Sequence, residues 1–387
     1  MNHIITLIGF SLFTLIICTI EIFLLKILQA HYWAYLLVGI IFISLVLNFY
    51  FKCISGWHYI WIWIGIIVLL LIILNTGRIR QDVSFSGNLT AGTLKFLTRD
   101  LSNNDSSSTN SQNTNYNWKT WTPPKGYSNK MYSVGDVKGY SLNKKHAQHS
   151  NQHHIIYQIH GGGYINGFSK MYNKTALKYA QASKDSPVFS IDYRVAPKFK
   201  YPTALNDVVD GYQWLLKQGY QPKDIIIAGD SAGGGLALAL TLKLQDNHQP
   251  LPKMLILSSP WTDLSAKGKS YRENFHKDVI FGSNQPPTKE TTNINVPYAR
   301  KDQLTNPYVS PVYGNYQHMP PMLIQTGADE MLLSDSQTIA RKVNQSGGQA
   351  QLITYPGMFH TFYVLTPWLP ESKHAWSNIE KFINSNI

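Results

Sequence analysis

The pentapeptide GDSAG at residues 229–233 places one serine between two glycines. The apolar run 224–228 before it predicts a strand, and the Gly-, Leu- and Ala-rich run after it predicts a helix. A serine on such a strand-to-helix turn exposes its hydroxyl at the start of a helix, where developing negative charge is favoured. We therefore interpret Ser231 as a nucleophile, and not as a small residue that only lets a helix pack on a sheet.

A serine nucleophile needs a base, and the base needs a carboxylate that orients it. For a serine on this kind of turn, the acid and then the histidine follow later in the chain. Asp329 comes just after the apolar run 321–327, and His360 comes just after the run 351–357. Both runs predict strands that end at the same edge of the sheet as Ser231. The order predicts a triad of Ser231, His360 and Asp329.

Two neighbouring acids are alternatives to Asp329. Glu330 is adjacent to it, so a change in the register of the loop would exchange the two. Asp335 falls about two turns into the helix that follows. The alternative for His360 is a loop histidine with no chemical role.

The stretch HGGGY at residues 160–164 predicts a turn that brings bare main chain to a ligand. Glycine is costly in a folded chain, and it allows backbone N–H groups to approach an oxyanion without a Cβ in the way. Another donor is the N–H of Ala232, directly after the nucleophile. His160 precedes the serine in the chain, so we expect it to brace this turn by hydrogen bonding and not to act as the base.

Short apolar runs alternate with helical patterns from residue 154 onward. The expected strands are 154–160, 187–193, 224–230, 253–259, 321–327 and 351–357, and the expected helices are 170–184, 203–218, 233–245, 334–346 and 372–384. Continuous apolar strands are typical of a sheet covered on both faces, and the alternation predicts a mostly parallel α/β fold. Segment 262–320 has no clear element and is a candidate lid or substrate-pocket segment.

The N-terminal region, residues 1–76, is strongly apolar. Three runs, near 4–25, 32–51 and 57–75, have the length of membrane-spanning helices. The alternatives are a cleaved signal peptide for the first run and buried core helices for all three. The three runs predict a multi-pass membrane protein, and the charges near the runs leave the side of the catalytic part open.

Residues 77–150 predict a linker and candidate cap region that contains the polar low-complexity stretch 101–117. Four histidines in 146–154 favour a solvated turn over a metal site, because no Cys or acidic residue flanks them. A catalytic domain is expected over 151–387.

The formal net charge is +12, but the basic residues are scattered, so an ordinary basic surface is favoured over a nucleic-acid partner. The only cysteines are Cys18 and Cys53, which excludes a disulfide framework. No cofactor and no metal are implied.

Residues 154–385 resemble the hormone-sensitive-lipase-like branch of the α/β-hydrolases, which includes arylacetamide deacetylases and bacterial carboxylesterases. The resemblance rests on HGGGY (160–164), DYRVAP (192–197), YPTALNDV (201–208), GDSAGG (229–234), SPWTDL (259–264), NPYVSP (306–311), MPPMLIQTGADEMLLSDS (319–336) and MFH (358–360).

The resemblance implies an α/β-hydrolase fold with Ser231, Asp329 and His360 as the triad. It implies that Gly162, Gly163 and Ala232 supply the oxyanion donors, with Gly161 needed for the turn. Asp192 and Arg194 would hold nearby loops. The family's N-terminal cap is replaced here by the apolar region.

We expect a membrane-anchored serine esterase that acts on short-chain or acetyl esters of small or lipid-like molecules. The alternatives are an acyltransferase or deacetylase acting on a membrane or cell-envelope substrate, and an inactive binding module. Tyr164, Tyr193, Trp261 and Phe359 are candidate pocket residues, although each is more often simple packing.

Overall fold

The computed structural model describes residues 2–51, 58–78, 80–101, 116–145 and 154–387. The chain divides into two compact units, residues 1–102 and 103–387. The histidine-rich stretch, apart from His154, and most of the low-complexity stretch lie outside the described residues, as does Cys53.

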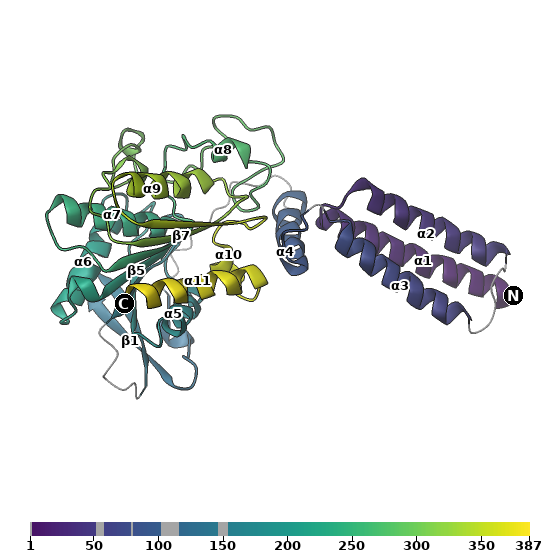
Figure 1. Cartoon of the computed structure of the whole chain (residues 1–387), viewed down its shortest axis with the longest axis horizontal. Helices are drawn as coiled ribbons and strands as arrows, with labels where there is room; N and C mark the ends of the chain where they lie inside the picture. The colour runs from purple at the N-terminus through teal and green to yellow at the C-terminus, as the bar shows by residue number, and fades with distance from the viewer. Residues whose placement is uncertain (1, 52–57, 79, 102–115, 146–153) are drawn as a thin grey trace. The chain divides into compact units, whose positions relative to one another are not determined.

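Three long helices make up most of the first unit (Figure 1): α1 (Asn2–Ile27), α2 (Tyr32–Phe51) and α3 (His58–Thr76). The helices coincide with the three apolar runs of the sequence. Their contacts include a small apolar core to which α1 contributes Leu25, α2 contributes Val38 and α3 contributes Ile73. Within the described residues, no helix combines the length and apolar character needed to cross a membrane. The prediction of three membrane-spanning helices is therefore not supported.

A further helix, α4 (Phe85–Phe96), continues into a π-helical turn at Leu97–Leu101. Ser84 caps α4, because its Oγ accepts the N–H of Gly87 at 2.9 Å. The sequence predicted only a linker or cap over this part of the chain, and it missed this capped helix.

The second unit is built on one eight-stranded sheet in the order β1-β2-β4-β3-β5-β6-β7-β8. Its strands are β1 (Tyr127–Val134), β2 (Val137–Lys144), β3 (Ile155–Ile159), β4 (Val188–Asp192), β5 (Ile225–Asp230), β6 (Met254–Ser258), β7 (Met322–Gly327) and β8 (Ala350–Tyr355). Strands β3 to β8 are parallel, and all six lie where apolar runs predicted strands. Most of their residues are buried, because helices cover both faces of the sheet.

The hairpin β1–β2 was not predicted. It joins the sheet through antiparallel pairing of β2 with β4, so the sheet begins upstream of the boundary expected at residue 151. Most β1 residues are partly or fully exposed, and the strand therefore lacks the continuous apolar run that identified the others.

Helices α5 (Lys170–Ala182) and α11 (Pro370–Asn386) lie together on one face of the sheet (Figure 1). Helices α6 (Thr203–Lys217), α7 (Ala232–Asp246) and α9 (Leu333–Gln345) lie on the other face. All five occupy predicted helical segments. Because α7 is buried along most of its length, its first residue is held firmly at the carboxyl edge of β5.

Segment 262–320 consists mainly of turns, with a short helix α8 (Ser270–Glu273) and two 3₁₀ turns. It has its own buried side chains, among them Tyr271, Phe275 and Tyr298, and these join the main core. The segment is therefore irregular in secondary structure but packed against the core of the catalytic domain.

Candidate active site

Ser231 stands alone between the end of β5 and the start of α7. Its backbone has φ 52° and ψ −122°, a conformation that is uncommon for a residue with a Cβ. A Cβ on Gly229 would overlap the backbone of Gly233, and a Cβ on Gly233 would overlap the carbonyl oxygen of Ile159. The two glycines of the pentapeptide are thus required by the close approach of neighbouring backbone.

His360 contacts the serine directly. Its Nε2 lies 2.8 Å from Ser231 Oγ, and both side chains are buried. The histidine follows β8 in the loop 356–361, which ends at Thr361 with φ 51°. The predicted pairing of Ser231 with His360 is present in the structure.

The acid beside His360 is Glu330. Its Oε2 lies 2.9 Å from His360 Nδ1, and the Glu330 side chain is fully buried. A carboxylate accepts hydrogen bonds, so Nδ1 carries the proton and Nε2 is left to accept the hydroxyl proton of Ser231. The three side chains form one line of donors and acceptors.

At His360 Nδ1, where the sequence predicted Asp329, the structure places Glu330. The chain turns sharply after β7: the N–H of Asp329 donates to the Met358 carbonyl, and the Gly327 N–H bonds to Glu330 Oε1. This turn directs the next residue, Glu330, back toward the strand end, whereas Asp329 stays half-buried. The alternative that the adjacent glutamate replaces the aspartate is the one the geometry supports.

Asp335, the second alternative acid, has another role. Its Oδ2 accepts the backbone N–H groups of Thr262 and Asp263, both at 2.8 Å. Asp335 therefore anchors the loop after β6, and no contact to His360 is present among the described residues.

The glycine turn supplies N–H groups beside the nucleophile. Gly162 has φ 111° and Gly163 has φ 63°, both in the range where glycine is favoured. Among the described residues, the N–H groups of Gly162, Gly163 and Ala232 have no acceptor. The N–H of Ala232 is one of the unpaired donors at the start of α7. These three groups are available to an oxyanion.

Gly161 differs from the other glycines of the turn. Its N–H donates to Asp230 Oδ1 at 3.3 Å, and a Cβ on Gly161 would overlap the same carboxylate. Asp230 immediately precedes Ser231 and is buried. Burial raises the pKa of Asp230 to about 7, although the nearby His360 and the Gly161 N–H act in the opposite direction. Gly161 therefore joins the turn to the nucleophile's strand and does not present its N–H to a substrate.

His160 braces the glycine turn. Its Nδ1 donates to the Gly161 carbonyl at 2.7 Å, and its ring stacks on Tyr193 with 4.1 Å between centroids. The Tyr193 hydroxyl in turn donates to the His160 carbonyl at 2.8 Å. Burial lowers the pKa of His160 to about 4, so the ring is neutral at physiological pH. These contacts agree with the bracing role expected for His160.

Comparison with known families identifies the fold. The sequence profile of a family described as alpha/beta hydrolase fold matches residues 156–364. The chain belongs to the α/β-hydrolase family. An esterase of Acinetobacter venetianus is 36% identical to this α/β-hydrolase over 234 residues, which cover 60% of this chain and 75% of that one. An acetyl-hydrolase of Streptomyces hygroscopicus is 31% identical over 217 residues, covering 56% and 71%.

Solved structures agree with these relatives. An esterase/lipase from an uncultured bacterium superposes with a TM-score of 0.65 at 27% identity, covering 76% of this chain and 98% of that one. An esterase from the bacterial hormone-sensitive lipase family gives a TM-score of 0.61 at 31% identity, covering 70% and 88%. The resemblance to hormone-sensitive-lipase-like esterases and the prediction of an ester hydrolase are confirmed.

An aromatic side chain, that of Phe281, lies beside His360 of this α/β-hydrolase. The ring of Phe281 lies 4.8 Å from that of His360 and 6.3 Å from that of Trp261, measured between centroids. Sequence analysis missed Phe281, because it lies in the irregular segment 262–320. The predicted pocket residues Tyr164, Tyr193, Trp261 and Phe359 are all nearly fully buried.

Asp192 and Arg194 hold loops, as the family resemblance implied. Asp192 accepts the Phe168 N–H at 3.3 Å and the Tyr140 hydroxyl at 3.1 Å. The guanidinium of Arg194 donates to Asp207 on α6, with its shortest contact at 2.6 Å. Neither side chain contacts Ser231 or His360 in the described part of the chain.

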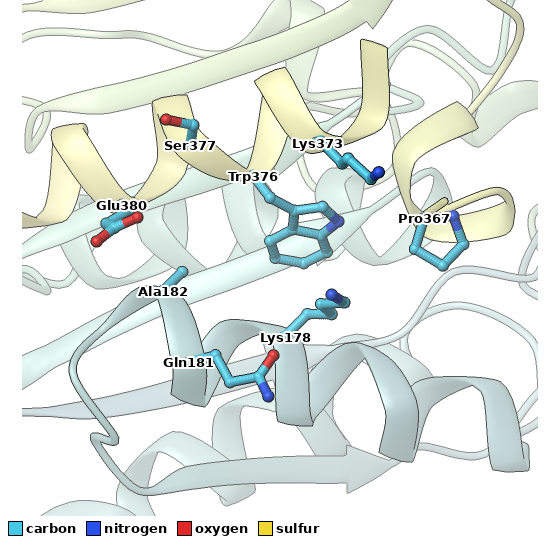
Figure 2. A pocket seen from close by; sticks show the side chains of 8 residues that line it. All are labelled: Lys178, Gln181, Ala182, Pro367, Lys373, Trp376, Ser377 and Glu380. Carbon is cyan, nitrogen blue, oxygen red and sulfur yellow. The ribbon is translucent and has the colours of Figure 1, made fainter. Parts of the chain in front are cut away.

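A pocket of about 280 Å³ lies between α5 and α11, away from the residues just described (Figure 2). It is lined by Lys178, Gln181, Ala182, Pro367, Lys373, Trp376, Ser377 and Glu380. None of these residues belongs to the candidate active site, so the pocket has no part in the chemistry proposed below.

Proposed function

We propose that this α/β-hydrolase cleaves carboxylic esters through an acyl-enzyme. Ser231 Oγ attacks the ester carbonyl carbon while His360 Nε2 takes the hydroxyl proton, and Glu330 stabilises the imidazolium that forms. His360 then gives the proton to the leaving alcohol. Water, deprotonated by His360, attacks the acyl-enzyme and releases the carboxylic acid and free Ser231.

The observation that carries this proposal is the unbroken hydrogen-bonded line from Ser231 through His360 to Glu330, with contacts of 2.8 and 2.9 Å. The N–H groups of Gly162, Gly163 and Ala232 support it, because a tetrahedral intermediate needs donors for its negative oxygen. Loss of one such donor typically raises the barrier by about 2.7–4 kcal/mol.

Short acyl chains are the substrates that we propose. The support is a relative named acetyl-hydrolase and the presence of Phe281 directly beside the His360 ring. Rates measured on p-nitrophenyl esters from C2 to C12 test the proposal. A maximum in kcat/KM at C8 or longer would contradict it.

A fluorophosphonate probe tests the nucleophile. We expect covalent labelling of the wild-type chain at Ser231, and neither labelling nor hydrolysis of p-nitrophenyl acetate after Ser231→Ala. Thermal unfolding of this variant should be nearly unchanged. Failure of the folded wild-type chain to react with the probe would favour an inactive binding module.

The acyltransferase and deacetylase alternatives are separated by product analysis. Added alcohol acceptors compete with water for the acyl-enzyme, so transfer that outpaces hydrolysis would replace the esterase proposal by a transferase. Cleavage of aryl acetamides in preference to the matching esters would favour a deacetylase.

Association with a membrane, with the side of the catalytic domain open, is a proposal that rests on the sequence. Its support is the number of large apolar side chains of α1, α2 and α3 that are exposed in the described residues, including Leu36, Ile40 and Leu71. Carbonate extraction of membranes from expressing cells tests it. Recovery of the full chain in the soluble fraction would contradict it.

A further inference from the structure

Ser259 occupies an unusual position directly after β6. Its side chain is buried, and its backbone has φ 44°, in the left-handed region that residues with a Cβ rarely adopt. The backbone is fixed there, because the Ser259 N–H donates to the Gln325 carbonyl of β7 at 2.9 Å.

The hydroxyl of Ser259 joins the two loops that carry Glu330 and His360. Its Oγ lies 2.6 Å from Glu330 Oε1 and accepts the N–H of Thr361 at 3.0 Å. An amide can only donate and a carboxylate can only accept, so the hydroxyl proton must point to Glu330. The direction of both hydrogen bonds is thereby determined.

The two carboxylate oxygens of Glu330 have different hydrogen-bond partners. Besides Ser259, Glu330 Oε1 is bonded by Thr326 Oγ1 at 3.0 Å and by the Gly327 N–H. Oε2 remains for His360. Thr326 and Gly327 belong to the same strand end and loop as Glu330, whereas Ser259 comes from another strand and also bonds the residue after His360.

The strained backbone indicates that the hydroxyl is used. Glycine would adopt φ 44° without the steric cost that a Cβ brings, which is of order 1–3 kcal/mol at positions of this kind. A serine in this place brings a buried donor to a carboxylate that lies in the active site. Residues held in strained conformations are concentrated at such sites.

We propose that Ser259 is a positioning residue of the active site, whose hydroxyl holds Glu330 and the His360 loop in register. His360 Nε2 is thereby kept aligned with Ser231 Oγ. The inference rests on the proposed serine-esterase function. It assigns Ser259 no contact with substrate and no proton transfer in the reaction.

The substitution Ser259→Gly removes the hydroxyl without leaving a strained backbone, so it separates the effect of the hydroxyl from the effect of the strain. We expect kcat on p-nitrophenyl acetate to fall about 10- to 100-fold, because small losses of alignment at a reacting centre have effects of this size. KM should change little, and labelling by the fluorophosphonate should slow in parallel with kcat. The midpoint of urea unfolding should not fall, since glycine relieves the strain. Ser259→Ala should show the same loss of kcat.

The matched control is Ser372→Ala. Ser372 lies on α11, is fully buried, and its hydroxyl has no partner among the described residues. Its loss removes a buried serine hydroxyl without touching Glu330, so kcat should stay at the wild-type value.

A double-mutant cycle shows whether Ser259 acts through Glu330. In a Glu330→Ala background, we expect Ser259→Gly to lower kcat by no more than about threefold, because coupled groups are not additive. An equal loss in both backgrounds would overturn the proposal, as would Ser259→Gly or Ser259→Ala with wild-type kcat. An inactive and unlabelled wild-type chain would instead refute the proposed function itself, so the two failures are distinguishable.

Discussion

Glu330 reaches His360 from the position directly after Asp329, with 2.9 Å between Oε2 and Nδ1. The sharp turn after β7 decides which of the two acids meets the histidine. The identity of the acid beside His360 thus depends on the conformation of the four residues 327–330.

The first prediction concerns these adjacent acids. Glu330→Gln should lower kcat by about 10³- to 10⁴-fold, because an amide can hold the imidazole in the wrong tautomer and cannot stabilise its positive charge. Asp329→Asn should lower kcat far less than Glu330→Gln, since Glu330 is the acid bonded to His360 Nδ1. Steady-state hydrolysis of p-nitrophenyl acetate measures both. The reverse order of effects would restore Asp329 as the acid.

The second prediction concerns the glycine turn. Gly162→Ala should lower kcat by about 10²- to 10³-fold, the loss expected when an oxyanion donor is misplaced. Its φ is 111°, and the new Cβ would lie 2.8 Å from the Asn166 carbonyl oxygen, so the turn must move. Gly163→Ala should lower kcat less than Gly162→Ala does, because the new Cβ would have no neighbouring atom nearer than 3.8 Å. Equal kcat values for the two variants would contradict the expected difference between Gly162 and Gly163.

The third prediction concerns His160 and pH. Its pKa is lowered to about 4 in the folded chain, while an unperturbed histidine has a pKa of about 6.5, so the unfolded chain binds more protons between these values. The contribution of neutral His160 to stability is fully present above pH 6.5. It is lost as pH falls toward 4, by about 3 kcal/mol in total.

Urea unfolding of wild type and His160→Asn at pH 4 to 8 measures this effect. We expect the difference in unfolding free energy between the two proteins to shrink as pH falls. The variant should still react with the fluorophosphonate at neutral pH. A pH-independent difference, or a folded variant with an unreactive Ser231, would contradict the bracing role.

The fourth prediction concerns Phe281. Its ring contacts His360 and Trp261, so Phe281→Ala opens space beside the base. We expect kcat/KM for hexanoate and octanoate esters to rise relative to acetate. Ile280→Ala is a suitable control, because Ile280 is exposed on the same segment. An unchanged chain-length profile would show that Phe281 does not limit the acyl group.

Much of the catalytic fold could be predicted from the sequence, because strands β3 to β7 are buried on both faces and therefore read as continuous apolar runs. The hairpin β1–β2 could not be recognised in the same way. β1 is an edge strand whose residues are mostly partly or fully exposed, and its polarity resembles that of a linker.

The site was predicted as far as local pattern determines it. Ser231 and His360 follow from strand ends and chain order. Glu330 does not, since the choice between adjacent acids depends on hydrogen bonds made by the Gly327 and Asp329 amides. Ser259 and Phe281 come from distant segments, and only the folded chain brings them to the site.

The close approach at Gly233 has a mechanical consequence. With no side chain in between, α7 rests directly on the carbonyls of Ile159 and His160, and this close packing restricts movement of the nucleophile relative to the glycine turn. The orientation of Ser231 relative to the glycine turn is therefore fixed when the domain folds, before an ester binds. We therefore expect motion that admits substrate or releases product to take place in other parts of the catalytic domain. The close packing at Gly233 limits the displacement of Ser231 Oγ between turnovers.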